Sequence, residues 1–128
     1  MLGKVVLWIS AFSFISYGVT CFFSPDVPAA YAGLTMTNGD AYAELGAMYG
    51  GLQAGVGLFC LLAALRNEYY RPALMLLVMA IGLLALGRLY STITGTEAVG
   101  FYTYGALAYE TVTAILAAIA LKLSAQPD

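Results

Sequence analysis

The chain has 128 residues, which is the length of one domain. It is 62% hydrophobic and 9% charged, whereas a typical soluble chain is about 45–50% apolar and about 25% charged, so an ordinary soluble domain is excluded. The formal net charge is −2 and no run of Lys or Arg occurs, which excludes the basic surface that nucleic-acid binding needs.

Four long apolar segments follow one another, each near the ~20 residues that cross a bilayer core. The first, residues 5–23, stops before Pro25 and Pro28 and is too long for the apolar part of a signal peptide. The second, residues 40–65, follows a turn and a capping residue at Asn38-Gly39-Asp40.

The third segment, residues 72–94, begins with Pro72, a residue favoured in the first turn of a helix. The fourth covers residues 101–123, and the loop over residues 24–39 can hold a short interfacial helix at residues 29–34. The runs are too long and too uniformly apolar for a β-barrel. We therefore expect one all-α transmembrane domain over residues 1–128, an antiparallel four-helix bundle.

The basic residues predict the orientation of this bundle. Lys4, Arg66, Arg71 and Lys122 all fall at the end that holds both termini, and the loops at the other end contain no Lys or Arg. By the positive-inside rule, both termini are expected in the cytoplasm. The chain is expected to cross the membrane several times, with the lipid bilayer as its surrounding partner.

The second segment is rich in glycine. Gly46 and Gly50 are four residues apart, as are Gly51 and Gly55, and the two pairs lie on nearly opposite faces of a helix. Small residues at that spacing let helix backbones approach one another. We expect this helix to lie centrally, with these four glycines at its packing faces.

Three charges lie inside the apolar segments. Glu44 lies in the first turns of the second segment, Arg88 about six residues before the end of the third, and Glu110 about nine residues into the fourth. At about 1.5 Å per residue, Arg88 and Glu110 lie roughly 9 Å and 14 Å from the outer end. A charge in hydrocarbon costs about 2.5–3.5 kcal/mol on insertion scales, so we expect Arg88 to pair with Glu110, and Glu44 to join them or to reach the outer interface.

Two carboxylates and one guanidinium leave one negative charge in excess. One Glu can be protonated, one can be hydrated, or the site can take a cationic group. A purely structural role for the three charges, holding helices in register, is equally compatible with the sequence. Tyr49, Gln53 and Ser91 lie at a similar depth, and Tyr17 can extend the polar network.

Residue types also narrow the chemistry. The chain has no histidine, the commonest metal ligand and near-neutral acid or base. Its two cysteines, Cys21 and Cys60, belong to opposite ends of the bundle and are not expected to meet. No nucleophile with a base and no glycine-rich phosphate loop is present. We expect no metal and no cofactor. An enzyme is the least expected class, and a membrane enzyme that uses Glu and Tyr as acid and base stays an open alternative.

Three stretches carry a family resemblance. They are residues 47–51 (AMYGG), residues 87–91 (GRLYS) and residues 109–110 (YE). With these, the chain resembles a family of small bacterial inner-membrane proteins with four helices, described only as a domain of unknown function; the layout is also similar to that of the DoxX-like proteins. The resemblance implies a bacterial membrane setting and points to Arg88, Ser91 and Glu110, but it implies no activity.

The first functional hypothesis is a non-enzymatic membrane protein that binds a small amphipathic or lipid-like ligand. Its pocket is expected in the outer half of the membrane, lined by Glu44, Tyr49, Gln53, Arg88, Ser91 and Glu110. The second hypothesis is a structural or assembly subunit that uses its glycine-rich helix against a membrane partner protein. The third is a small proton-coupled transporter, acting as a homo-oligomer.

Overall fold

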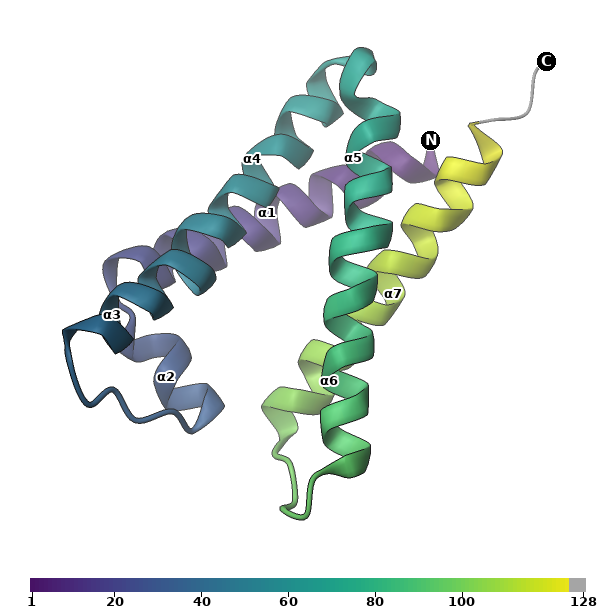
Figure 1. The fold of residues 1–128 in the computed structure, drawn as a ribbon. Helices are drawn as coiled ribbons and strands as arrows, with labels where there is room; N and C mark the ends of the chain where they lie inside the picture. The colour runs from purple at the N-terminus through teal and green to yellow at the C-terminus, as the bar shows by residue number, and fades with distance from the viewer. Residues whose placement is uncertain (125–128) are drawn as a thin grey trace.

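The computed structural model describes residues 1–124, and these fold into helices joined by short loops (Figure 1). The seven α-helices are α1 (Leu2–Phe23), α2 (Asp26–Ala32), α3 (Gly39–Leu45), α4 (Leu52–Leu65), α5 (Tyr70–Leu76), α6 (Gly82–Thr94) and α7 (Phe101–Leu123). A π-helical segment, Gly46–Gly51, joins α3 to α4, and a second, Leu77–Ile81, joins α5 to α6. A single 3₁₀ turn, Asn67–Tyr69, precedes α5.

Four continuous helices are long and apolar enough to cross a membrane. They are Leu2–Phe23, Gly39–Leu65, Asn67–Thr94 and Phe101–Leu123, called spans one to four below. The prediction of an all-helical chain with four spanning helices is confirmed, and the protein is a multi-pass membrane protein. The spans alternate in direction, so α1 begins and α7 ends at one end of the bundle, the termini end (Figure 1). The opposite end, with α2 and the loop over residues 95–100, is the loop end.

Local sequence explains where the helices start and stop. The Asn38 side chain accepts a hydrogen bond of 3.0 Å from the backbone N–H of Ala41, which caps α3. Gly33, with a φ of 68°, ends α2 in a left-handed conformation that suits glycine. The short helix expected at residues 29–34 is observed at Asp26–Ala32. It begins three residues earlier than expected because Pro25, whose φ is fixed, precedes its first residue.

The spans form two antiparallel pairs, which meet at the termini end and diverge toward the loop end (Figure 1). In the first pair, α1 packs along α4 and the Gly46–Gly51 segment; in the second, α7 packs along α5, Leu77–Ile81 and α6. The pairs touch where α1 meets α7 and α5, and where α4 meets α5. The apolar core lies here, around Leu7, Leu74, Leu77, Cys60 and Ala117, none of which is solvent-exposed. Cys21 and Cys60 are both buried and free.

Glycine packing differs from what the sequence predicts. A Cβ on Gly50 would lie 2.6 Å from Phe22 Cα, and one on Gly57 would lie 2.6 Å from the Ile15 backbone nitrogen, so these two glycines let span two touch α1. A Cβ on Gly46 would come no nearer than 3.9 Å to Pro25.

A Cβ on Gly51 would meet only its own helix, at 4.0 Å, and one on Gly55 would meet nothing within 4 Å among residues 1–124. Within residues 1–124, Gly51 and Gly55 therefore bring no other helix close, and the packing role expected of them stays a prediction. The two glycines that contact α1, Gly50 and Gly57, are seven residues apart. That spacing is two helical turns, so both lie on the same face of span two.

Candidate functional site

Arg88 and Glu110 form a bidentate ion pair between α6 and α7. Arg88 Nε donates to Glu110 Oε2 at 2.9 Å, and Arg88 Nη2 donates to Glu110 Oε1 at 2.7 Å. The Glu110 side chain is 7% exposed and that of Arg88 is 24% exposed. Two parallel, charge-assisted hydrogen bonds are the strongest arrangement these groups can make. The predicted pairing of Arg88 with Glu110 is confirmed.

The hairpin of α6 and α7 brings the two residues together. Arg88 lies six residues before the end of α6 at Thr94, and Glu110 lies nine residues after the start of α7 at Phe101. At about 1.5 Å per residue their backbones differ in depth by roughly 5 Å, a gap that the arginine side chain spans. The Thr92 hydroxyl donates to the backbone oxygen of Arg88 at 2.8 Å. This bond satisfies the O–H donor of Thr92 within its own helix.

Tyrosines from several elements gather on the loop-end side of this ion pair. The hydroxyls of Tyr17 in α1 and Tyr102 in α7 are hydrogen-bonded at 3.2 Å. Tyr31 in α2 stacks on Tyr102, with ring centroids 5.9 Å apart and an interplanar angle of 19°. Tyr102 thus connects α7 to α1 and α2.

The other predicted site residues are placed differently. Glu44 is exposed and makes no salt bridge within residues 1–124, so it does not join the ion pair. Ser91 is also exposed, and no hydrogen bond joins it to Arg88 or Glu110 within residues 1–124. Gln53 is half-buried on α4, and no hydrogen bond of its side chain occurs in the described part of the chain. Of the six predicted residues, the structure brings Arg88 and Glu110 into direct contact.

The separation of Glu44 changes the charge of the buried cluster. Arg88 and Glu110 neutralise each other, and the surplus carboxylate lies apart in span two, in the first turns after the loop end. The expectation of an excess negative charge within one cluster is corrected accordingly. The physical reason is the divergence of the helix pairs, since α3 packs on α2 and the Gly46–Gly51 segment, away from the α6–α7 hairpin.

Sequence reasoning missed the roles of Tyr31 and Tyr102, since neither is among the residues expected at the site. The spacing of Tyr102 and Glu110, eight residues on one helix, is a weak sign that they lie toward the same side. The stacking of Tyr31 depends on α2 folding back toward α7, a contact that chain order does not encode.

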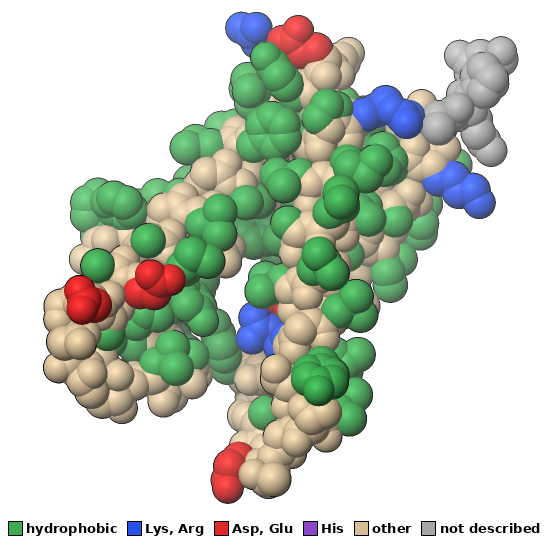
Figure 2. Space-filling model, viewed as in Figure 1, with side chains coloured by type: hydrophobic (Ala, Val, Ile, Leu, Met, Phe, Trp, Pro, Cys, Tyr) green, Lys and Arg blue, Asp and Glu red, His purple; other side chains and the backbone are tan. Residues whose placement is uncertain are grey.

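A hollow lies between the two helix pairs on the face shown in Figure 2, and a basic side chain lies on its wall. Hydrophobic side chains line much of its border, while acidic side chains lie at the loop end of both arms. The hollow is open because the helix pairs diverge. The basic side chain on its wall places a charge inside it.

Comparison with known proteins gives one match. The model of a family described as a domain of unknown function, DUF4345, matches residues 2–121. The chain belongs to the DUF4345 family. The matched residues reach into all four spans, and the match confirms the resemblance to a family described as a domain of unknown function. No curated protein matches the chain, and no solved structure matches it.

Proposed function

We propose that this DUF4345 protein binds a small amphipathic or lipid-like molecule in the hollow between its helix pairs, with the polar head at the Arg88–Glu110 ion pair. The proposal rests on a partly exposed, charge-neutral ion pair at membrane depth and on the hollow between the helix pairs, which has a basic side chain on its wall. No chemical step is proposed, since the site contains no nucleophile with a base.

The ion pair retains hydrogen-bonding capacity for a ligand. A guanidinium carries five N–H donors, and the two bonds to Glu110 use Nε and one N–H of Nη2. The remaining donors have no partner within residues 1–124. A head with acceptor oxygens fits them, and its apolar tail would lie along the hydrophobic border of the hollow.

The charge of the surroundings narrows the head group. Asp26, Asp40, Glu44 and Glu97 belong to the loop end. Arg88 already pairs with Glu110, and the other basic residues belong to the termini end. Their summed field disfavours a multiply anionic head. A neutral or zwitterionic head with acceptor oxygens is therefore the favoured class.

Stability alone is a weak reason for keeping this ion pair. Replacing a buried ion pair with apolar residues of similar volume is often neutral or stabilising by about 1–4 kcal/mol. A binding role supplies a reason for keeping a guanidinium whose donors are only partly used.

A thermal-shift experiment with short-chain lipids tests the proposal. Protein in maltoside detergent is titrated with lipids that carry a glycerol, a phosphocholine or a phosphoglycerol head on the same chains. The wild type is expected to gain stability, most with phosphocholine or glycerol. Arg88→Leu combined with Glu110→Leu should lose that gain while remaining folded, because it leaves no unpaired charge.

The matched control replaces the exposed ion pair at the termini end. Arg66 and Glu68 lie 3.6 Å apart with side chains 67% and 61% exposed, and Arg66→Leu with Glu68→Leu should keep the full lipid response. An equal lipid response in both double variants would show that the head does not bind at Arg88, and the proposal would be wrong.

We also propose a bacterial inner membrane with both termini in the cytoplasm. Its support is the basic termini end, because the positive-inside rule places such an end in the cytoplasm. There, Lys4 donates to the backbone oxygens of Ala63 and Ala64 at 3.2 and 2.8 Å, and Arg71 donates to Ser124 at 3.0 Å. An alkaline phosphatase fused into the loop over residues 95–100 should be active, and one fused after the last residue inactive. The reverse pattern would overturn this orientation.

A second candidate function is assembly with another membrane protein or with a second copy. Gly51 and Gly55 form a face of span two that contacts no other helix among the described residues, and such a face suits a close helix–helix contact. Purification from native membranes should retain a stoichiometric partner that Gly55→Leu releases. The transporter hypothesis has less support, since the surplus carboxylate of Glu44 lies outside the buried pair.

A further inference from the structure

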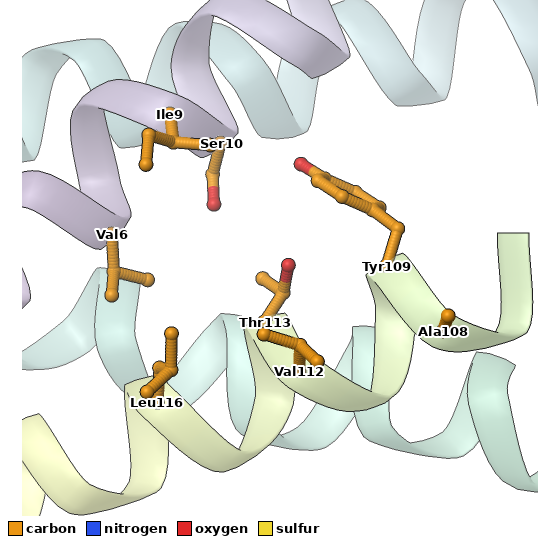
Figure 3. Close-up of a pocket in the computed structure, with 8 residues that line it drawn as sticks. All are labelled: Val6, Ile9, Ser10, Ala108, Tyr109, Val112, Thr113 and Leu116. Atoms are coloured by element: carbon orange, nitrogen blue, oxygen red, sulfur yellow. The ribbon is translucent and has the colours of Figure 1, made fainter. Parts of the chain in front are cut away.

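A second polar site lies in the groove between α1 and α7, away from the ion pair. Ser10 on α1 and Tyr109 and Thr113 on α7 point their hydroxyl groups toward one centre (Figure 3). Val6 and Leu116 form apolar walls around them. The site thus combines three neutral hydroxyls with hydrocarbon surroundings.

Two of these hydroxyls lack the partner that burial demands. Ser10 Oγ and Tyr109 OH are buried and have no hydrogen-bond partner within residues 1–124, and Ser10 as a whole is only 1% exposed. A buried polar group without a partner costs about 1–3 kcal/mol. Two such groups facing one cavity indicate that something with a polar atom belongs between them.

The groove is large enough for more than a water molecule. Its volume is about 330 Å³, which is within the roughly 300–1,000 Å³ of typical ligand pockets. One water needs only about 30 Å³ of liquid volume. An oxygen placed at the hydroxyls would therefore leave room for a substantial apolar body.

The groove opens toward lipid chains rather than toward water. Its rim residues Ile9 and Val112 are each 54% exposed. Ser10 follows the start of α1 by eight residues and Thr113 precedes the end of α7 by ten. At 1.5 Å per residue these positions lie roughly 12–15 Å from the termini end, near the middle of a hydrocarbon core of about 30 Å.

The position of the tyrosine is stabilised by packing. Phe14 is 6% exposed and its ring meets that of Tyr109 edge to face, with centroids 6.0 Å apart. This contact restricts the ring and holds its hydroxyl in the groove. The site therefore exists before any ligand arrives.

We propose that this groove binds a neutral, hydrophobic molecule that carries a hydroxyl or carbonyl oxygen and that enters from the lipid phase. A carbonyl oxygen has two lone pairs and can accept from Ser10 and Tyr109 together, while a ligand hydroxyl can donate to one and accept from the other. Val6 and Leu116 contact the apolar body. Because no charge takes part, this ligand differs in class from the amphiphile proposed at Arg88, and the inference is independent of that proposal.

Decanol and decane form the test pair, because they differ in one hydroxyl and partition into the same micelles. In thermal-shift titrations of the intact chain, the wild type should gain roughly 2–4 °C more with decanol than with decane. Ser10→Ala combined with Tyr109→Phe removes both hydroxyls at nearly constant shape. This variant should be at least as stable as the wild type without ligand and should respond equally to the two compounds.

The matched control is Tyr90→Phe with Ser91→Ala, which removes the same two groups from the exposed face of α6. It should keep the full preference for decanol, as should Arg88→Leu with Glu110→Leu. Equal responses of the wild type to decanol and decane would mean that water alone satisfies the hydroxyls and would overturn the inference. A decanol preference that survives in Ser10→Ala with Tyr109→Phe would overturn it as well.

Discussion

The two helix pairs are held together by different means. Along α1 and span two, glycines bring backbones into contact, with Gly50 against Phe22 and Gly57 against Ile15. Between α6 and α7, the bidentate bond from Arg88 to Glu110 joins the helices instead. In lipid there is no hydrophobic force between helices, so association depends on close packing and polar bonds. The first pair is therefore joined by backbone contact, and the second by a partly exposed ion pair.

The largest expected effect comes from breaking the ion pair on one side only. Arg88→Leu leaves Glu110, 7% exposed, without its partner and should lower the free energy of unfolding by about 3–5 kcal/mol. The double variant with Glu110→Leu should recover most of that loss. Unfolding in mixed micelles of increasing denaturing detergent measures both. If Arg88→Leu alone were as stable as the wild type, the Glu110 carboxylate would have to reach water, and the ion pair would not support the hairpin.

A smaller effect is expected from filling the contact between the first two spans. Gly57→Ala places a methyl group 2.6 Å from the Ile15 backbone and should cost about 1–3 kcal/mol by overpacking. Gly55→Ala, on the open face of the same helix, should change stability by less than about 0.5 kcal/mol. The same micelle titration applies. Equal effects at the two positions would show that the close contact does not support the first pair.

The smallest effect is expected from the hydrogen bond that links α1 to α7 on the loop-end side of the ion pair. Tyr17→Phe removes the 3.2 Å hydrogen bond to Tyr102 and should cost about 0.6 kcal/mol, the average for side-chain hydrogen bonds between membrane helices. Tyr104→Phe, on an exposed ring of α7, serves as the control. A loss at Tyr17 comparable to that of Arg88→Leu would mean that the tyrosine contact, rather than the apolar core, joins the pairs.

The spans themselves could be predicted from the sequence. Runs of apolar residues, Pro25 after the first span and the Asn38 cap before α3 determine where helices run, and these signals are local in the chain. The pairing of Arg88 with Glu110 could also be predicted, because two residues at similar distance from a short loop meet across an antiparallel hairpin.

The remaining parts of the site could not be predicted in this way. Glu44 lies at a suitable depth, yet it belongs to a helix pair that diverges from the hairpin, and depth alone does not specify lateral position. Gly51 and Gly55 have the spacing of a packing motif, but the face used is that of Gly50 and Gly57. Several faces of one glycine-rich helix satisfy the same local pattern, and only contact with α1 selects among them.

The sequence by itself thus determined an all-helical membrane protein with four spans and one internal ion pair, because apolar length and buried charge dominate energies in lipid. The tertiary structure alone decided that the pairs diverge, that Tyr31 stacks on Tyr102, and that Ser10 faces Tyr109 across a groove. These features depend on how whole helices tilt and pack against one another. Such packing is a sum of many small contacts between residues far apart in the chain, which no local pattern records.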